Sequence, residues 1–580
     1  MLRKTLLWVR ASESRSIINL RRSLAVGGSI GALLGFFNSY GYAISGYTTS
    51  ELTPIVAGVL TYLLYRVAIR RYSIYDLVTS LAFAVGIDIT TTLTSGMLIT
   101  YTLLAERADP LTLGLATWTY GSLRPELVAF YLFACAVSAG GILIALALSD
   151  HFIEEERLVF PIGGASWRVI STSGSLKGVY VVLALALGLI AQLFAFFRET
   201  SIDLAPTLYL LVPGAAFCLS ISPAIFLLAL LLPIGSSLGV GLGSLLTFLL
   251  ITPALTYLGL LVPLPTMSSY DIATSASSSI ASILIGYLVL VATYYLVKYR
   301  KVFTRSFSFL KEIKEYRRSF ILGVALVSLP IVPTAMVYED PARVMLLAPA
   351  LLVLYVIITV LTCRVVGEVG IVSQSTLPAV TGLLFASGIR GATPYVLLDP
   401  YTGTPMPQFV AASFMNVAKL SRYAGMKPSF TGAAMMLGIL LGAPLTLLYG
   451  NLLLSAYGTS SPKLPLIRWL PVITWMRAIF SGNILALPIE PIAIGSLLAL
   501  ALLALVELTG FRGLSVYAVL VGFTVTPDIG LLFILAALIK YLALRVGPDV
   551  YESVVAYSSI ALAGSTVAVV LYTLLELLGV

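Results

Sequence analysis

The chain has 580 residues, of which 59% are hydrophobic and only 11% are charged. A soluble globular chain is about 25% charged, so this composition excludes a soluble fold. The net charge of +9 does not indicate a nucleic-acid partner, because the Lys and Arg residues lie where short loops meet apolar runs, which is how membrane proteins set their topology.

Apolar runs long enough to cross a hydrocarbon core of roughly 30 Å recur along the whole chain. Run length and helix breakers predict sixteen spans: 23–45, 51–69, 76–104, 125–149, 178–197, 205–232, 238–262, 275–298, 319–338, 344–363, 371–398, 404–420, 430–457, 485–509, 513–545 and 553–577. Prolines interrupt 205–262. We count this stretch as two crossings, because the most basic loop, from Lys298 to Arg318, then falls on the same side of the membrane as the basic leader 1–22. The status of 205–262 and of 463–483 stays open.

The first apolar run follows a basic leader, residues 1–22, but it is too long for a signal peptide and lacks a cleavage site. We therefore expect the leader to be retained, with both termini in the cytoplasm and the chain in the cytoplasmic membrane. The cysteines Cys135, Cys218 and Cys363 lie far apart in apolar segments. Neither a disulfide framework nor a Cys-based zinc site is indicated.

The two halves of the chain resemble each other. The matched segments are 21–27 with 317–323, 66–67 with 364–365, and 81–87 with 383–389. Their order is kept and their offset is nearly constant, which indicates duplication. Eight spans per half predict parallel repeats about an axis along the membrane normal. We divide the chain into the leader (1–22), a first half (23–298), a basic linker (299–318) and a second half (319–580).

Ionisable side chains inside a bilayer are costly, so they mark either function or a buried pair. Asp88 lies in the middle of the third predicted span, and the repeat places Arg390 at the equivalent position of the second half. In one interpretation, Asp88 is a proton acceptor that responds to Arg390 and to substrate. In the other, the two residues form a static ion pair that fixes the halves. Both interpretations stay open.

Polar groups at the end of the first predicted span offer a second set of candidates. The stretch 36–42 carries the amide of Asn38 and the phenols of Tyr40 and Tyr42. Such groups line pathways and bind peptide-like ligands, whereas interfacial tyrosines are also ordinary membrane anchors. We expect Asn38 to face a cavity, keep Tyr40 as a candidate for substrate binding or coupling, and favour an anchor role for Tyr42.

The eleventh predicted span begins after Glu368 and carries Gln374. Its glycines, together with Pro378 and Gly382, permit unwound backbone, which a membrane tolerates only against a cavity or another helix. We favour a broken helix that lines the pathway, with Glu368 and Gln374 as candidate substrate or coupling residues.

The remaining titratable groups suggest no catalytic centre. Glu490 and Asp528 lie near span ends, where interfacial or capping roles are expected. The acidic run 154–156 predicts a solvated face, and His151, the only histidine, cannot form a metal site alone. Nucleotide-binding and zinc-protease motifs do not occur. We therefore expect no enzyme activity, no metal and no cofactor.

Several segments, taken in order, match one family of carriers. They are Leu20–Gly27 with Phe37–Tyr40, Glu155–Ala165, and Val521–Pro527 followed by Ala561–Ser565. Together they resemble the oligopeptide transporter family, which includes the yellow-stripe-like metal-chelate carriers, in the form of a divergent, prokaryotic-type member. Gly164 stands where the family commonly has threonine, and the bulky Trp167 follows closely, so substrate specificity does not transfer. The resemblance spans nearly the whole chain and implies sixteen spans, proton coupling, and peptide or metal-chelate cargo.

These observations together predict a secondary active transporter coupled to protons. Its expected partners are a short peptide or peptide-like, metal-chelating solute, the coupling proton and membrane lipid. An amino-acid or other small-solute permease is the first alternative. An intramembrane lipid-linked transferase is the second, although it would need clustered acids or a nucleophile with its base. Substrate identity, coupling ion, direction and oligomeric state stay open.

Overall fold

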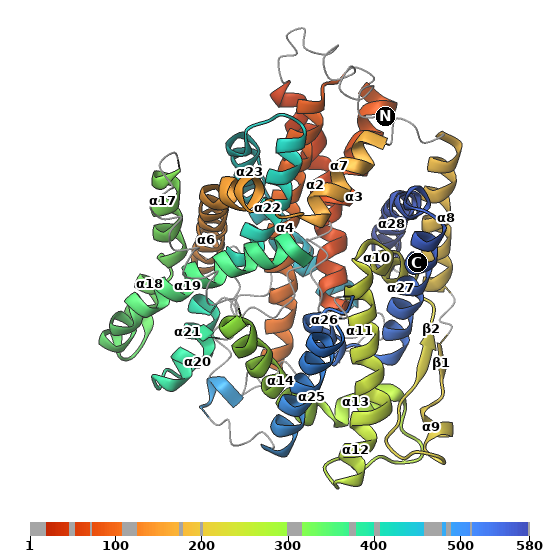
Figure 1. Cartoon of the computed structure of the whole chain (residues 1–580). Helices are drawn as coiled ribbons and strands as arrows, with labels where there is room; N and C mark the ends of the chain where they lie inside the picture. The colour runs from red at the N-terminus through yellow and green to blue at the C-terminus, as the bar shows by residue number, and fades with distance from the viewer. Residues whose placement is uncertain are drawn as a thin grey trace.

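The computed structural model of the chain is mostly helical in the residues that it describes (Figure 1). Those residues are 19–45, 53–69, 72–106, 125–172, 178–197, 201–298, 316–369, 379–399, 407–457, 478–482, 489–510 and 513–577. Within them, nine helices are long and apolar enough to cross a membrane, and a tenth is reached if the bent pair Ser269–Ser275 and Ser279–Val291 forms one span. An all-α polytopic membrane protein is thus confirmed, while sixteen spans and parallel repeats stay predictions.

The first half contains α2 (Leu20–Ser45), α3 (Thr53–Leu64), η2 (Tyr65–Ile69), α4 (Ile74–Glu106), α6 (Pro125–Asp150), η4 (His151–Glu155), α7 (Pro161–Thr172), α8 (Gly178–Phe197), β1 (Ser201–Asp203), α9 (Ala205–Leu208), β2 (Cys218–Ser220), α10 (Pro223–Leu231), α11 (Ile234–Leu246), η5 (Thr247–Ile251), α12 (Thr252–Tyr257), α13 (Ser269–Ser275) and α14 (Ser277–Lys298). The second half contains α17 (Arg317–Ser328), α18 (Ile331–Val337), α19 (Pro341–Val369), α20 (Ala379–Ala386), α21 (Ala392–Leu398), α22 (Pro407–Tyr423), α23 (Pro428–Tyr457), α25 (Ile489–Thr509), α26 (Val516–Gly522), α27 (Pro527–Val546) and α28 (Pro548–Leu577).

The candidate spans differ in how deeply they lie inside the protein. In α4, 89% of the window Ile74–Thr91 is buried, whereas only 17% is buried in Val179–Phe197 of α8 and in Ile489–Thr509 of α25. The exposed side chains of α8 and α25 are mostly apolar. Since apolar surface of this extent is stable against lipid tails, α8 and α25 form part of the outer surface and α4 part of the interior.

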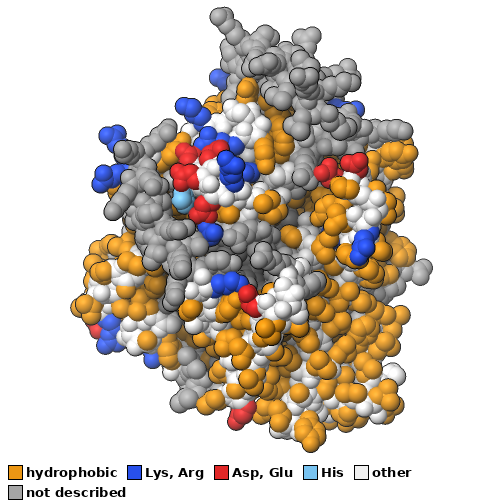
Figure 2. Space-filling model, in the orientation of Figure 1, with side chains coloured by type: hydrophobic (Ala, Val, Ile, Leu, Met, Phe, Trp, Pro, Cys, Tyr) orange, Lys and Arg blue, Asp and Glu red, His pale blue; other side chains and the backbone are white. Residues whose placement is uncertain are grey.

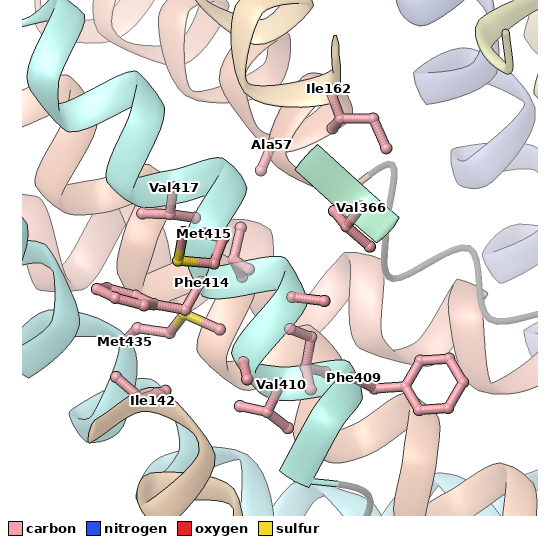
Figure 3. Close-up of a cluster of buried hydrophobic side chains, with 14 of the residues drawn as sticks. Ala57, Ile142, Ile162, Val366, Phe409, Val410, Phe414, Met415, Val417 and Met435 are labelled. Atoms are coloured by element: carbon pink, nitrogen blue, oxygen red, sulfur yellow. The ribbon is translucent and has the colours of Figure 1, made fainter. Parts of the chain in front are cut away.

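Helix α22 lies at the centre of the main core (Figure 3). Its buried residues Phe409, Val410, Phe414, Met415 and Val417 meet Ala57 of α3, Ile142 of α6, Ile162 of α7, Val366 of α19 and Met435 of α23. A helix that is surrounded in this way carries few charges and makes most of its contacts with other helices. Five elements from both halves are therefore packed around one helix of the second half.

Pairs of glycines join the two halves. A Cβ added at Gly86 in α4 would lie 2.1 Å from the carbonyl oxygen of Met435, and one added at Gly438 in α23 would lie 2.3 Å from that of Phe83. The same reciprocal contact joins α6 with α17 through Gly140 and Gly323, α8 with α28 through Gly188 and Gly564, α11 with α26 through Gly243 and Gly522, and α14 with α25 through Gly286 and Gly495. Small residues let helix backbones approach closely in membranes. Each pair unites a first-half helix with a second-half helix, so the halves interleave.

The stretch 205–232 differs from the expected span. Instead of one continuous helix it contains the short α9, the strand β2 and the nine-residue α10, and Ser201 of β1 pairs with Ser220 of β2. Proline supplies no backbone N–H and interrupts helices. The prolines that made this stretch ambiguous therefore break it, whereas Ile234–Tyr257 forms one candidate span. Most of 463–483 lies outside the described residues.

Within the described residues 379–399, the eleventh predicted span is broken after Gly382 rather than at it, and Pro378 lies outside the described residues. Helix α20 ends at Ala386 and α21 begins at Ala392, and Gly388 and Gly391 between them have φ of 76° and 89°. Glycine adopts this left-handed region without steric cost. Gly382 itself lies within α20.

Candidate functional site

Glycines spaced four residues apart bring α2 against α4, side by side in Figure 1. A Cβ added at Gly27 would lie 2.3 Å from the carbonyl oxygen of Ser80, and one added at Gly31 would lie 2.9 Å from the backbone of Ala84. Only small residues permit this approach. Because Asn38 follows about two turns after Gly31 on the same helix, its side chain lies beside α4.

Asn38, Thr53 and Asp88 form one buried polar cluster where α2, α3 and α4 meet. Asn38 Nδ2 donates to Asp88 Oδ1 at 2.6 Å and to Thr53 Oγ1 at 3.2 Å, while Thr53 Oγ1 donates to Asp88 Oδ2. The three side chains are at most 4% exposed. A buried carboxylate is tolerated only when hydrogen bonds replace its water, and the amide and the hydroxyl supply such bonds on both oxygens.

This cluster can accommodate two protonation states of Asp88. The ionised carboxylate only accepts hydrogen bonds, whereas the protonated acid also donates one. The Thr53 hydroxyl both donates and accepts, so it can receive the proton of the neutral acid without moving far. A site that takes up and releases protons needs hydrogen bonds that stabilise both the ionised and the protonated form of its acid.

The second half also contributes to the surroundings of Asp88. Tyr449 of α23 lies close enough to Asp88 to interact electrostatically with it. Its hydroxyl donates to the carbonyl oxygen of Ala32 at 2.6 Å, and its ring meets Phe36 edge-on at 5.2 Å. The cluster is therefore enclosed by α2, α3 and α4 from one half and by α23 from the other.

Arg390 lies in the break between α20 and α21. Its guanidinium Nη1 donates to the carbonyl oxygens of Phe385 at 3.0 Å and Ile389 at 2.9 Å, and it lies 4.5 Å from the centre of the Phe385 ring. Among the ion pairs of the described residues, none joins Arg390 to Asp88. Arg390 thus stabilises the end of a broken helix, and its role in coupling stays a prediction.

Three further candidates lie outside what the structure describes. Helix α2 includes Tyr40 and α19 includes Glu368, but their side chains are not among those described, and Gln374 lies in the segment 370–378 outside the described residues. Their predicted roles stay predictions.

Asp528 and Glu490 have different surroundings. Asp528, near the start of α27, is 4% exposed and accepts hydrogen bonds from Ser220 Oγ at 2.6 Å and Tyr270 Oη at 3.3 Å. Asp528 therefore joins β2 and α13 to α27 and does not face the membrane–water interface. Glu490 is exposed, as expected for an interfacial residue.

Ion pairs gather at the end of α6. Glu156 binds Arg364 and His151, and Arg422 binds Asp150. Burial alone would raise the pKa of Glu156, but the hydrogen bond with His151 and the charge of Arg364 outweigh it, so this pKa lies below its usual value. The acidic run 154–156 is thus only partly a solvated face.

Figure 2 shows charged side chains grouped in the upper part of one face, above a broad hydrophobic surface.

Sequence reasoning missed three buried polar residues. Thr53 lies near the start of the second predicted span, 51–69, where a polar residue is unremarkable. Asp399 follows α21, is 1% exposed and accepts a hydrogen bond from Thr381 at 2.5 Å. Lys540 lies within α27 and is fully buried. An ionisable residue in the middle of a span is a signal in itself, so Lys540 was detectable from the sequence.

The comparisons with known proteins give no family. No protein-family model matches the chain, and no curated protein matches it. Within the described residues, no group of three or more His, Cys, Asp or Glu side chains is placed to hold a metal ion. The candidate site therefore depends on its own geometry.

Proposed function

We propose that the chain is a secondary active transporter in which proton binding at Asp88 is coupled to movement of the cargo. The observation that carries this proposal is the enclosure of the buried Asp88 carboxylate by an amide and a hydroxyl. Carriers use intramembrane acids of this kind as proton relays. Since α4 and α23 belong to different halves, relative movement of the halves would change the surroundings of Asp88.

For the cargo, we propose a short peptide or a peptide-like, metal-chelating solute, moved across the cytoplasmic membrane. This part of the proposal is supported by the resemblance to the oligopeptide transporter family. An amino-acid or other small-solute permease would use the same coupling with another cargo. A thermal-shift screen of peptides, amino acids and metal chelates on the purified protein separates these cargo classes, because a ligand of the folded state raises the unfolding midpoint.

The proposed mechanism is tested in proteoliposomes with whichever cargo the screen finds. The wild-type protein should accumulate this cargo when the pH gradient is applied, and an uncoupler should abolish the accumulation. The Asp88→Asn variant keeps the shape of the side chain and resembles the protonated acid, because an amide both donates and accepts hydrogen bonds, but it cannot exchange a proton. It should therefore lose accumulation while retaining exchange of labelled for unlabelled cargo, and proton-driven accumulation by this variant would refute the coupling role.

Asp76 offers a matched control on the same helix. It is 5% exposed and accepts hydrogen bonds from the backbone N–H groups of Asn19 at 2.9 Å and Ser73 at 3.1 Å. This is the geometry of a residue that caps the start of α4. Asp76→Asn retains a side-chain acceptor and should leave proton-driven accumulation intact.

A further inference from the structure

The connection between α10 and α11 leaves two carbonyl oxygens without helical partners. Helix α10 ends at Leu231, Leu232 is extended with ψ of 156°, and Pro233 precedes α11. In a helix, the N–H of residue 233 would donate to the carbonyl of Ala229, but proline has no N–H. The extended backbone at Leu232 removes its carbonyl from the helical pattern as well.

The ammonium of Lys540 occupies this break. Lys540 on α27 is 0% exposed, and its Nζ donates to the carbonyl oxygen of Ala229 at 2.8 Å, to Ser237 Oγ at 2.8 Å and to the carbonyl oxygen of Leu232. An ammonium has three N–H donors, and here three oxygens receive them. In the described part of the chain no carboxylate forms an ion pair with Lys540. Nζ of Lys540 is thus held by neutral oxygens alone.

We propose that the α10–α11 break is a monovalent-cation site that the chain fills with its own Lys540 ammonium. Unwound carbonyls and the C-terminal ends of broken helices are the groups with which carriers bind Na⁺. Two carbonyls and one hydroxyl are hard, neutral oxygen donors suited to a single charge. Where the proposed transport function holds, this internal cation also makes transport independent of an alkali ion at the break.

Removing the ammonium tests the site directly. Lys540→Ala deletes the charge and the long side chain, so the three oxygens lose the ammonium and surround an unfilled space, with Ser237 Oγ still donating to the carbonyl oxygen of Ala229. Lys540→Met deletes the charge but keeps most of the volume, so no ion can enter. Arg545→Ala is the control, because Arg545 lies on the same helix, is exposed and donates hydrogen bonds to Tyr541 Oη.

Unfolding midpoints of the purified full-length proteins are measured in detergent with NaCl, KCl or choline chloride at equal ionic strength. In choline chloride, both Lys540 variants should unfold at lower temperature than the wild type. For Lys540→Ala alone, the midpoint should rise with the logarithm of the Na⁺ or K⁺ concentration, as mass action requires for an ion that binds the folded state. Wild type, Lys540→Met and Arg545→Ala should show no difference between alkali and choline salts.

The proposal is overturned if alkali ions do not stabilise Lys540→Ala beyond choline, or if they stabilise Lys540→Met equally. It is also overturned if Lys540→Ala cannot be recovered as folded protein in any alkali chloride, because an ion should then replace the ammonium. The assay needs no transport activity. Its failure therefore leaves the transporter proposal intact, and a failure of Asp88-coupled transport leaves the cation site intact.

Discussion

The side-chain amide of Asn38 donates to the carboxylate of Asp88 at 2.6 Å across the contact between α2 and α4. Both residues are buried, so water cannot replace this bond. The amide is therefore part of what keeps a charged group stable inside the bundle, and its loss should be felt in the stability of the whole protein.

Replacing Asn38 by leucine tests this relationship. Asn38→Leu keeps a similar volume but removes the donor to Asp88, and an unsatisfied buried group costs about 1–3 kcal/mol. The measurement is the free energy of unfolding in detergent. Ser29→Ala is the control, because Ser29 is exposed on the same helix and its hydroxyl donates to the carbonyl oxygen of Ala25 one turn earlier. Equal stability of the two variants would mean that the amide does not support Asp88.

The contact between the halves predicts a steric effect at Gly438. Gly438→Ala would place a Cβ 2.3 Å from the carbonyl oxygen of Phe83, so α23 and α4 would have to separate. Overpacking of this kind costs typically about 1–3 kcal/mol, which a lower thermal midpoint should report. Gly28→Ala is the matched substitution, since its Cβ would meet only a ring atom of Phe83 at 3.5 Å. If both alanines are tolerated equally, the close crossing of α4 and α23 is wrong.

Local sequence could predict Asn38 and Asp88 as candidates, but not their contact. Both stand out because polar and ionisable residues are rare in spans. Their contact depends on how α2 lies on α4, and the α4–α23 crossing depends on glycines hundreds of residues apart, Gly86 and Gly438. Hydropathy shows that a segment is apolar, but it does not show which other helix the segment packs against.

The stretch 205–232 shows a second limit. Its prolines signalled an interruption, yet mean hydropathy cannot distinguish a spanning helix from a short apolar helix such as α10 beside a hairpin. The break near Arg390 was predictable in kind, because glycines allow unwound backbone. Its position was not, because Gly382 and Gly388 look equivalent in sequence and only Gly388 has a positive φ.

Glu156 predicts a pH dependence of stability. Its pKa lies below the ordinary value of 4.5, because the hydrogen bond with His151 and the charge of Arg364 outweigh burial. The unfolded chain therefore binds a proton more readily than the folded one. The stabilisation is fully present above the unfolded pKa and is lost as pH falls through the folded pKa.

The variant Glu156→Gln should consequently be less stable than the wild type at neutral pH, by on the order of 1 kcal/mol. The gap in unfolding midpoint should close once the pH falls below the ordinary pKa of 4.5 and through the lower pKa of the folded protein. Glu154→Gln serves as the comparison, because Glu154 is 58% exposed and approaches Arg422 only at 3.7 Å. A gap for Glu156→Gln that persists at a pH well below the ordinary pKa of 4.5 would contradict the assignment.

An exchange of charges decides between the two interpretations of Asp88 and Arg390. The guanidinium of Arg390 bonds to the carbonyls of Phe385 and Ile389 within its own break, and a carboxylate at this position cannot donate to them. Arg390→Asp should therefore weaken the break, and Asp88→Arg should place a cation against Asn38 Nδ2, which is itself a donor.

Each single variant should lose proton-driven uptake and stability, and the double variant should recover neither, because each site is stabilised by its own neighbours. Unfolding midpoints and uptake in proteoliposomes measure both outcomes. Recovery of folding and transport in the double variant would instead establish a static pair between the halves and remove Asp88 from the coupling mechanism.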